Sequence, residues 1–85
     1  MIWINGQLLS AETARIDPRD RGFTLGDGLF ETLAARDGHP LDLALHLERL
    51  ARGSVVLELP LPVEATEVAT AIGQVLRSEE HTSEL

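Results

Sequence analysis

The sequence predicts an α+β domain, in which hairpins form an antiparallel sheet and two helices pack on it. Two observations carry this prediction. Asn-Gly and Asp-Gly pairs stand between short β-prone segments, and two later segments repeat apolar residues with helical spacing. Strands followed by helices are typical of a sheet covered by helices on one layer. The 85 residues suffice for one small domain.

The first hairpin is expected over residues 1–9. Residues 1–4 are apolar and β-prone, and Asn5-Gly6 follows at once. Asn-Gly is the preferred pair for a type I′ turn, because both central residues need positive φ. Residues 7–9 then form the returning strand.

A loop is expected over residues 10–28, because this stretch contains a proline and three glycines. A strand is expected next over residues 29–36. Asp37-Gly38 is a second two-residue hairpin signal. The return over residues 39–41 is kept short by its proline.

The first helix is expected from Leu43 to about Gly53, with Asp42 as its N-cap. A further turn to Val56 stays open as an alternative. Apolar residues recur at i, i+4 and i+7 and form one stripe along this helix. The stripe consists of Leu43, Leu47 and Leu50.

The second helix is expected over residues 63–76, after a stiff connector with two prolines at residues 59–62. Glu64 and Glu67 lie near its start, where the helix dipole favours negative charge. Its apolar residues share one face, as in a helix that packs on a core. They are Val68, Ala71, Ile72, Val75 and Leu76.

The last nine residues, 77–85, match codon by codon the in-frame translation of a common sequencing adapter. Such a segment is set aside before fold reasoning. We therefore expect the natural domain to be visible over residues 1–76 only, as the start of a longer protein. An ordinary polar tail is the alternative.

The composition narrows the class of protein. With a formal net charge of −7 the domain is a poor binder of nucleic acid, and no apolar run is long enough to span a membrane. The absence of cysteine suits a reducing, cytoplasmic setting, where we expect this protein. All seven basic residues are arginines, so the chain has no lysine.

Residues 20–32 form the densest segment, a glycine-rich loop that runs into a predicted strand. Glycines let backbone approach a ligand closely. A plain turn cluster is the simpler interpretation from the residues alone, since no phosphate-loop lysine is present. The aspartates are too irregular for a calcium loop, and no metal site is expected.

Arg49 lies at the edge of the leucine stripe on the first predicted helix, with His46 one turn before it. A guanidinium there suits a phosphate or a carboxylate. Arg52 points away and is spaced to pair with Glu48. The alternatives are a surface arginine whose stem lies along the core and a purely structural histidine.

Three motifs in this order resemble the class IV aminotransferases, the fold-type IV pyridoxal-phosphate enzymes. This family includes branched-chain aminotransferases, D-amino-acid aminotransferases and aminodeoxychorismate lyases. Residues 2–6 (IWING) resemble its first strand and turn, residues 20–32 (DRGFTLGDGLFET) its signature loop, and residues 46–50 (HLERL) its His-x-x-Arg-Leu helix. The likeness covers nearly all of residues 1–76, as the small N-terminal domain.

The resemblance implies roles for individual residues. Arg49 matches the arginine that holds the 5′-phosphate of pyridoxal phosphate, and Phe30 matches a position facing the substrate pocket. Gly28 and Glu31 frame the same wall, and His46 matches a recurrent supporting residue. The D-amino-acid enzymes carry a tyrosine at the position of Phe30, whose hydroxyl helps to hold the substrate carboxylate. Its absence favours branched-chain or lyase members.

The resemblance also implies an activity for the full-length protein. It would be a homodimer that moves an amino group from an amino acid, with the branched-chain class favoured, to a 2-oxo acid. The nearest alternative is an aminodeoxychorismate lyase that makes 4-aminobenzoate and pyruvate. The family's Schiff-base lysine lies in a later domain, so this lysine-free chain is expected to be inactive by itself. A non-enzymatic, anion-binding module is an alternative of another class.

Overall fold

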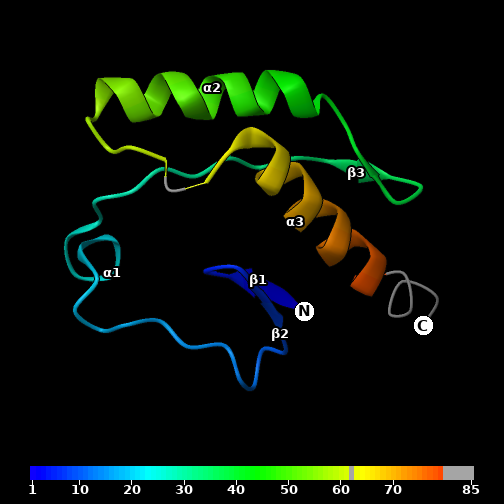
Figure 1. The fold of residues 1–85 in the computed structure, drawn as a ribbon, viewed down its shortest axis with the longest axis horizontal. Coiled ribbons are helices and arrows are strands. Elements are labelled where there is room, and N and C mark those ends of the chain that lie inside the picture. The colour runs from blue at the N-terminus through cyan, green and yellow to red at the C-terminus, as the bar shows by residue number, and fades with distance from the viewer. Residues whose placement is uncertain (62, 80–85) are drawn as a thin grey trace.

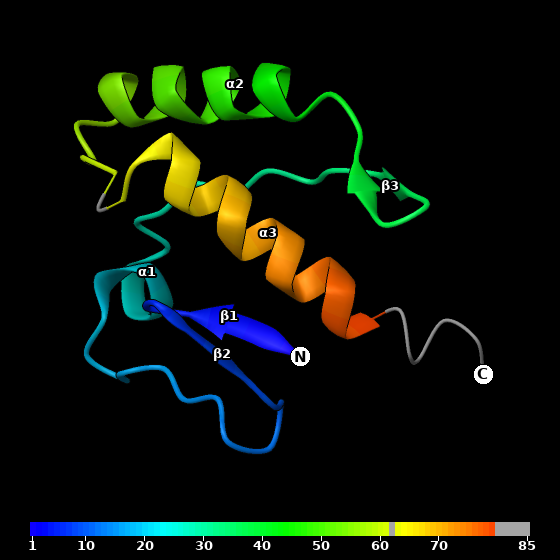
Figure 2. The same ribbon diagram turned by 45° about the vertical axis from the view of Figure 1, so that its right-hand side comes forward.

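The fold is α+β, as predicted, with two β-hairpins and two long helices. The computed structural model describes residues 1–61 and 63–79. The helix α3 lies between α2 and the β1–β2 hairpin in both ribbon views (Figures 1 and 2). In chain order the elements are β1 (Ile2–Ile4), β2 (Gln7–Leu9), α1 (Arg21–Leu25), β3 (Ala35–Arg36), β4 (His39–Pro40), α2 (Leu43–Val56) and α3 (Ala65–Glu79).

The N-terminal hairpin forms where it was predicted. β1 and β2 are antiparallel, with Trp3 opposite Leu8. Asn5 and Gly6 have φ values of 48° and 90°. Both central residues therefore adopt the left-handed conformation that a type I′ turn requires.

The second hairpin is shorter than predicted. Its turn is confirmed, since Asp37 and Gly38 have φ values of 53° and 77°. The strand expected over residues 29–36 is wrong for residues 29–34, which have no ladder partner within the described part of the chain. A strand needs the backbone of a neighbour, and the two hairpins form separate two-stranded sheets.

The loop over residues 10–28 contains a short helix, α1, that was not predicted. The Asp20 carboxylate accepts a hydrogen bond of 2.7 Å from the Gly22 amide and caps its start. Gly26, at φ 72°, ends it in the left-handed conformation. The sequence contained this signal, because a capping aspartate and a terminal glycine stand at helical spacing.

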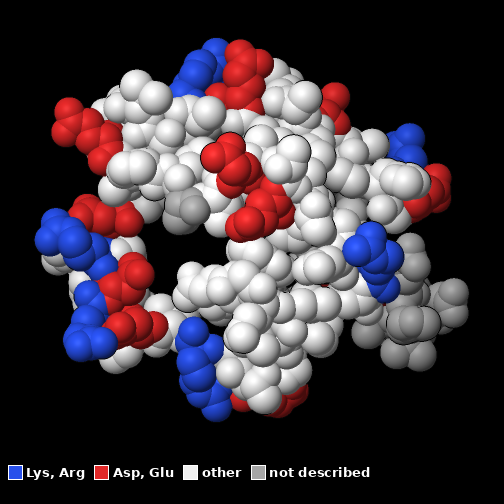
Figure 3. Space-filling view, viewed as in Figure 1, with Lys and Arg blue, Asp and Glu red and all other residues white. Residues whose placement is uncertain are grey.

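Acidic and basic side chains lie together over the loop around α1 (Figure 3). Arg19 pairs with Asp17 at 3.0 Å, and Arg21 pairs with Asp27 at 2.7 Å. Hydrogen bonds from Arg19 hold the pKa of Asp17 below its ordinary value. All four side chains are exposed, so these pairs order the loop locally and stabilise the fold little.

Helix α2 takes the longer of the two alternatives and runs to Val56. The prediction that the Asp42 side chain caps it is wrong. Asp42 has φ 55°, and its side chain makes no capping hydrogen bond, whereas a capping residue normally has extended φ and ψ. The Asp42 carbonyl instead accepts the first helical bond, from the His46 amide at 3.1 Å.

Helix α3 begins two residues later and ends three residues later than predicted. Its last turn includes Arg77, whose positive charge suits the C-terminal end of the helix dipole. The Glu79 carboxylate forms an ion pair with the N-terminal amine of Met1 at 3.1 Å. Pro62 and residues 80–85 lie outside the described residues, and the adapter origin of residues 77–85 stays a prediction.

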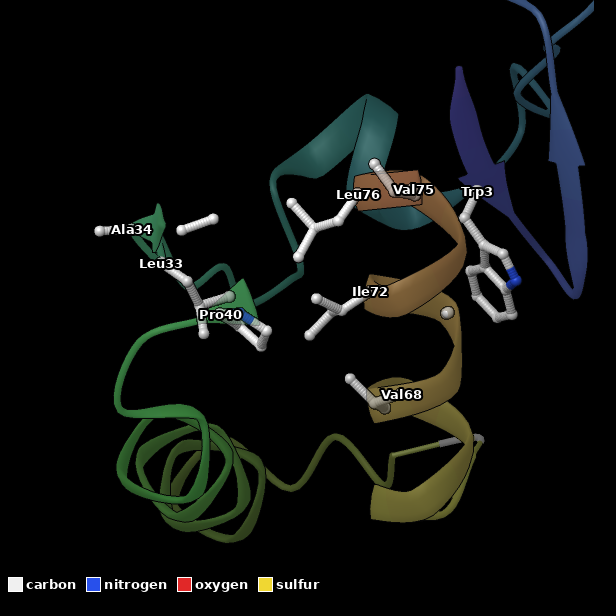
Figure 4. A pocket seen from close by; sticks show the side chains of 10 residues that line it. Trp3, Leu33, Ala34, Pro40, Val68, Ile72, Val75 and Leu76 are labelled. Carbon is white, nitrogen blue, oxygen red and sulfur yellow. The ribbon is translucent and has the colours of Figure 1, made fainter. Parts of the chain in front are cut away.

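The apolar core is small and surrounds α3, which contacts β1, β2 and β4. Figure 4 shows Val68 and Ile72 extending from α3 toward Leu33 and Pro40, beside an apolar hollow of about 320 Å³. Ala71 is the buried hydrophobic residue among those described, at 7% exposure. The predicted apolar face of this helix is therefore the one that packs.

Candidate functional site

Three of the predicted site residues come together where α2 passes the segment before β3. One carboxylate oxygen of Glu31, Oε1, lies 2.5 Å from Nδ1 of His46 and 3.9 Å from Nη1 of Arg49. His46 and Arg49 are three residues apart on α2, so both project from the same face of the helix. The sequence motif thus folds into one polar cluster, which we call the Glu31–His46–Arg49 cluster.

The members of this cluster differ in their contact with water. The side chains of Glu31 and His46 are each 18% exposed, whereas that of Arg49 is 56% exposed. A hydrogen bond between two largely buried polar groups is stronger than one at the surface. The carboxylate and the imidazole therefore form the fixed part of the cluster, and the guanidinium reaches solvent.

The Arg49 guanidinium can accommodate an oxyanion. Its 3.9 Å contact with Glu31 is longer than a hydrogen bond, and no hydrogen bond joins Arg49 to another of the residues that the structure describes. Its planar N–H groups match the geometry of a phosphate or carboxylate. The N–H donors of Arg49 therefore fit the phosphate group of pyridoxal phosphate.

At Gly53, α2 comes close to the segment that carries Glu31. A Cβ atom at Gly53 would lie 3.1 Å from Cδ2 of Leu29. Glycine has no Cβ atom, so the Leu29 methyl group can keep its present position only if residue 53 is glycine. Gly53 was predicted only as a possible helix end, because this contact depends on a residue distant along the chain.

A hollow of about 230 Å³ lies beside the cluster. Its polar lining comes from Glu31 and His46, and the other lining residues are apolar. Most of them come from α2, α3 and the segment before β3. The full lining is Leu29, Phe30, Glu31, Leu33, His46, Leu47, Leu50, Val68 and Ile72.

The remaining predicted residues lie at different places. Phe30 borders this hollow but is 88% exposed, so it forms an edge of it. Gly28 lines a separate hollow with Leu57 and Leu59. Its role in the substrate wall stays a prediction.

The second arginine of α2 behaves as the sequence predicted. Arg52 pairs with Glu48 at 3.9 Å, one turn apart on the helix, and both side chains are about two-thirds exposed. This pair lies away from Glu31 and lines none of the hollow beside it. Arg52 and Glu48 therefore provide matched controls for Arg49 and Glu31.

Residues 1–61 and 63–79 contain neither a metal-binding cluster nor a helix that could cross a membrane. No group of three or more histidine or acidic side chains there is arranged to hold a metal ion. None of the helices in this part of the chain is both long enough and apolar enough to cross a bilayer.

About two-thirds of the sequence matches a known family. Residues 28–83 match the model of amino-transferase class IV. This match contains all three members of the Glu31–His46–Arg49 cluster. The chain belongs to the class IV aminotransferase family.

Individual relatives carry different activities in their names. The chain is 34% identical over 77 residues to an aminodeoxychorismate lyase of Bacillus subtilis, covering 91% of this chain and 26% of the relative. It is 29% identical over 76 residues to a D-alanine aminotransferase of Staphylococcus haemolyticus, covering 89% and 27%. It is 30% identical over 76 residues to a provisionally named branched-chain-amino-acid aminotransferase of Methanocaldococcus jannaschii, covering 89% and 26%.

The chain thus spans about a quarter of the length of these relatives. No solved structure matches it. Family membership rests on the sequence, and the position of the cluster rests on the structure.

Proposed function

We propose that the full-length protein is a pyridoxal-phosphate enzyme, in which Arg49 holds the 5′-phosphate of the cofactor. The observation that supports this most directly is the exposed guanidinium of Arg49, which has unused N–H groups beside a largely buried carboxylate. A phosphate is doubly charged and accepts several hydrogen bonds, so a planar fork binds it better than a point charge does. Family membership supports the same cofactor.

When bound, pyridoxal phosphate supplies an electron sink for bond breaking at the α-carbon of an amino acid. The residues of this chain bind the cofactor and orient it. Arg49 holds the phosphate, and the apolar hollow beside Glu31 excludes water from part of the site. The chain contains no lysine, so the residue that attaches the cofactor lies outside it and the isolated chain is inactive.

The proposed reaction moves an amino group from an amino acid to a 2-oxo acid. Branched-chain amino acids are the favoured donors because Phe30 lacks a hydroxyl group that would bind a substrate carboxylate. The relative from Methanocaldococcus jannaschii is consistent with this donor class. The D-alanine aminotransferase from Staphylococcus haemolyticus represents the competing donor class.

A lyase that releases pyruvate from aminodeoxychorismate is the second candidate, and the Bacillus subtilis relative favours it. The two activities differ in their need for an amino acceptor. Full-length protein would be given each amino substrate with and without excess 2-oxoglutarate. Turnover that depends on the acceptor supports the aminotransferase, and turnover without it supports the lyase.

The role of Arg49 is tested by comparing two ligands on the full-length apoprotein. Pyridoxal lacks the phosphate of pyridoxal phosphate, so the ratio of their affinities measures recognition of the phosphate. We expect Arg49→Ala to lower this ratio by about 10- to 100-fold, the range for a lost charge-assisted contact. Arg52→Ala is the matched control and should leave the ratio unchanged. Equal ratios for the wild type and Arg49→Ala would refute the assignment.

A further inference from the structure

The geometry points to Glu31 as a positioning residue, held by His46, that orients the Arg49 guanidinium toward the cofactor phosphate. This inference rests on the proposed role of Arg49. It concerns the two side chains behind the arginine, and it assigns Glu31 a task apart from the substrate wall. It follows from the sharing of one oxygen, Glu31 Oε1, between the imidazole and the guanidinium.

The Glu31 carboxylate is fixed before any ligand binds. Its Oε1 lies 2.5 Å from Nδ1 of His46, and both side chains are 18% exposed. Neither group can turn into water without leaving the other partly buried and unpaired, which is costly. Because His46 belongs to α2 and Glu31 precedes β3, this contact also joins two separate segments of the chain.

The fixed carboxylate limits how Arg49 moves. A long arginine side chain loses considerable rotamer freedom when a ligand orders it. A carboxylate 3.9 Å from Nη1 attracts one edge of the guanidinium. The other N–H groups then face away from Glu31, and the weak contact leaves Nη1 able to bind a stronger acceptor. Part of the ordering is thus complete before the phosphate arrives.

The same carboxylate also has an opposing effect, because its negative charge lowers the positive potential around Arg49. When Glu31 is removed, the two effects change phosphate recognition in opposite directions. If orientation dominates, Glu31→Ala weakens phosphate recognition. If charge dominates, Glu31→Ala strengthens it. The burial of Glu31 against His46 favours orientation, since the hydrogen bond to the imidazole holds the carboxylate in place.

The experiment measures the affinity ratio of pyridoxal phosphate to pyridoxal in full-length apoprotein variants. We expect Glu31→Ala to lower the ratio by about 2- to 5-fold, the range for one lost ion-pair contact to a partly exposed side chain. Glu31→Gln should retain most of it, because the amide oxygen still accepts from His46. Glu48→Ala, which removes the exposed acid paired with Arg52, is the matched control.

Two variants of the histidine make the test independent of how well Glu31→Ala folds. In His46→Asn the amide Nδ2 can replace the Nδ1 donor, so the ratio should stay near the wild-type value. His46→Leu keeps the apolar contacts but not the donor, and should lower the ratio as Glu31→Ala does. A structural role alone would weaken both ligands equally and leave the ratio unchanged.

The double variant separates this inference from the proposed function. With Arg49 already replaced by alanine, Glu31→Ala should no longer affect the ratio. An unchanged or higher ratio in Glu31→Ala, or independent effects in the double variant, would overturn the positioning role while leaving that of Arg49 intact. If Arg49→Ala itself leaves the ratio unchanged, the proposed function fails.

Discussion

Gly53 of α2 passes so close to Leu29 that a Cβ atom at Gly53 would lie 3.1 Å from the Leu29 Cδ2 atom. Leu29 lies two residues before Glu31, and Gly53 lies one helical turn after Arg49. There is therefore little room for a side chain on α2 where it faces the segment that carries Glu31. A site composed of separate segments depends on such packing contacts as much as on its polar side chains.

Replacing Gly53 by leucine should push α2 away from the segment that carries Glu31. We expect a loss of stability of about 1–3 kcal/mol from overpacking, together with weaker binding of pyridoxal phosphate. Chemical denaturation and a cofactor titration of the full-length protein measure the two effects. Ala51→Leu, at an exposed position of the same helix, is the control. If both variants behave like the wild type, α2 is not held by this contact.

Introducing a hydroxyl group at Phe30 tests the donor class. Phe30 is 88% exposed, so Phe30→Tyr should leave the stability within about 0.5 kcal/mol of the wild type. If this residue faces the substrate, the rate with D-alanine relative to a branched-chain donor should rise by about 3- to 10-fold, as for one added hydrogen bond. Phe23→Tyr, at 67% exposure, is the control. An unchanged preference would remove Phe30 from the substrate wall.

The left-handed conformation of Gly26 should make the end of α1 sensitive to substitution. At φ 72°, alanine is strained, and we expect Gly26→Ala to destabilise the full-length protein by about 1–2 kcal/mol. Asparagine tolerates this conformation better, so Gly26→Asn should recover part of the loss. Thermal unfolding distinguishes the two variants. Equal melting temperatures for all three proteins would show that this turn does not constrain the loop.

The isolated 85-residue chain should associate and should not bind pyridoxal phosphate stably. Phe30, Val55 and Val56 are each more than three-quarters exposed, and such apolar surface promotes self-association. Light scattering across a concentration series measures the association. The chain has no lysine, so its N-terminal amine is the one amine that could react with the cofactor aldehyde. Acetylating this amine prevents that reaction. A monomeric, acetylated chain with a stable cofactor absorbance would instead support an independent anion-binding module.

The origin of residues 77–85 can be tested on the source DNA. We expect a read prepared without the adapter to show different codons after Leu76, with the reading frame continuing to a lysine codon downstream. The same nine codons followed by a stop would show that residues 77–85 are an ordinary tail. That outcome would also favour the anion-binding module over the enzyme.

Local signals in the sequence predicted most of the local structure. Asn5-Gly6 and Asp37-Gly38 predicted both turns, because tight hairpins select residues that tolerate positive φ. The strand over residues 29–36 could not be delimited in this way. Its length depends on whether another strand lies beside it, which is a property of the tertiary structure.

Motifs and residue spacing were enough to predict the family, the α+β class and the helix that carries His46 and Arg49, since spacing along a helix fixes which residues share a face. The contact of Glu31 with both of them through one oxygen atom became visible with the folded structure. The structure also places Gly28 in a hollow with Leu57 and Leu59. Contacts between segments depend on how the elements pack, and a close approach such as that of Gly53 to Leu29 has no periodic signal in the chain.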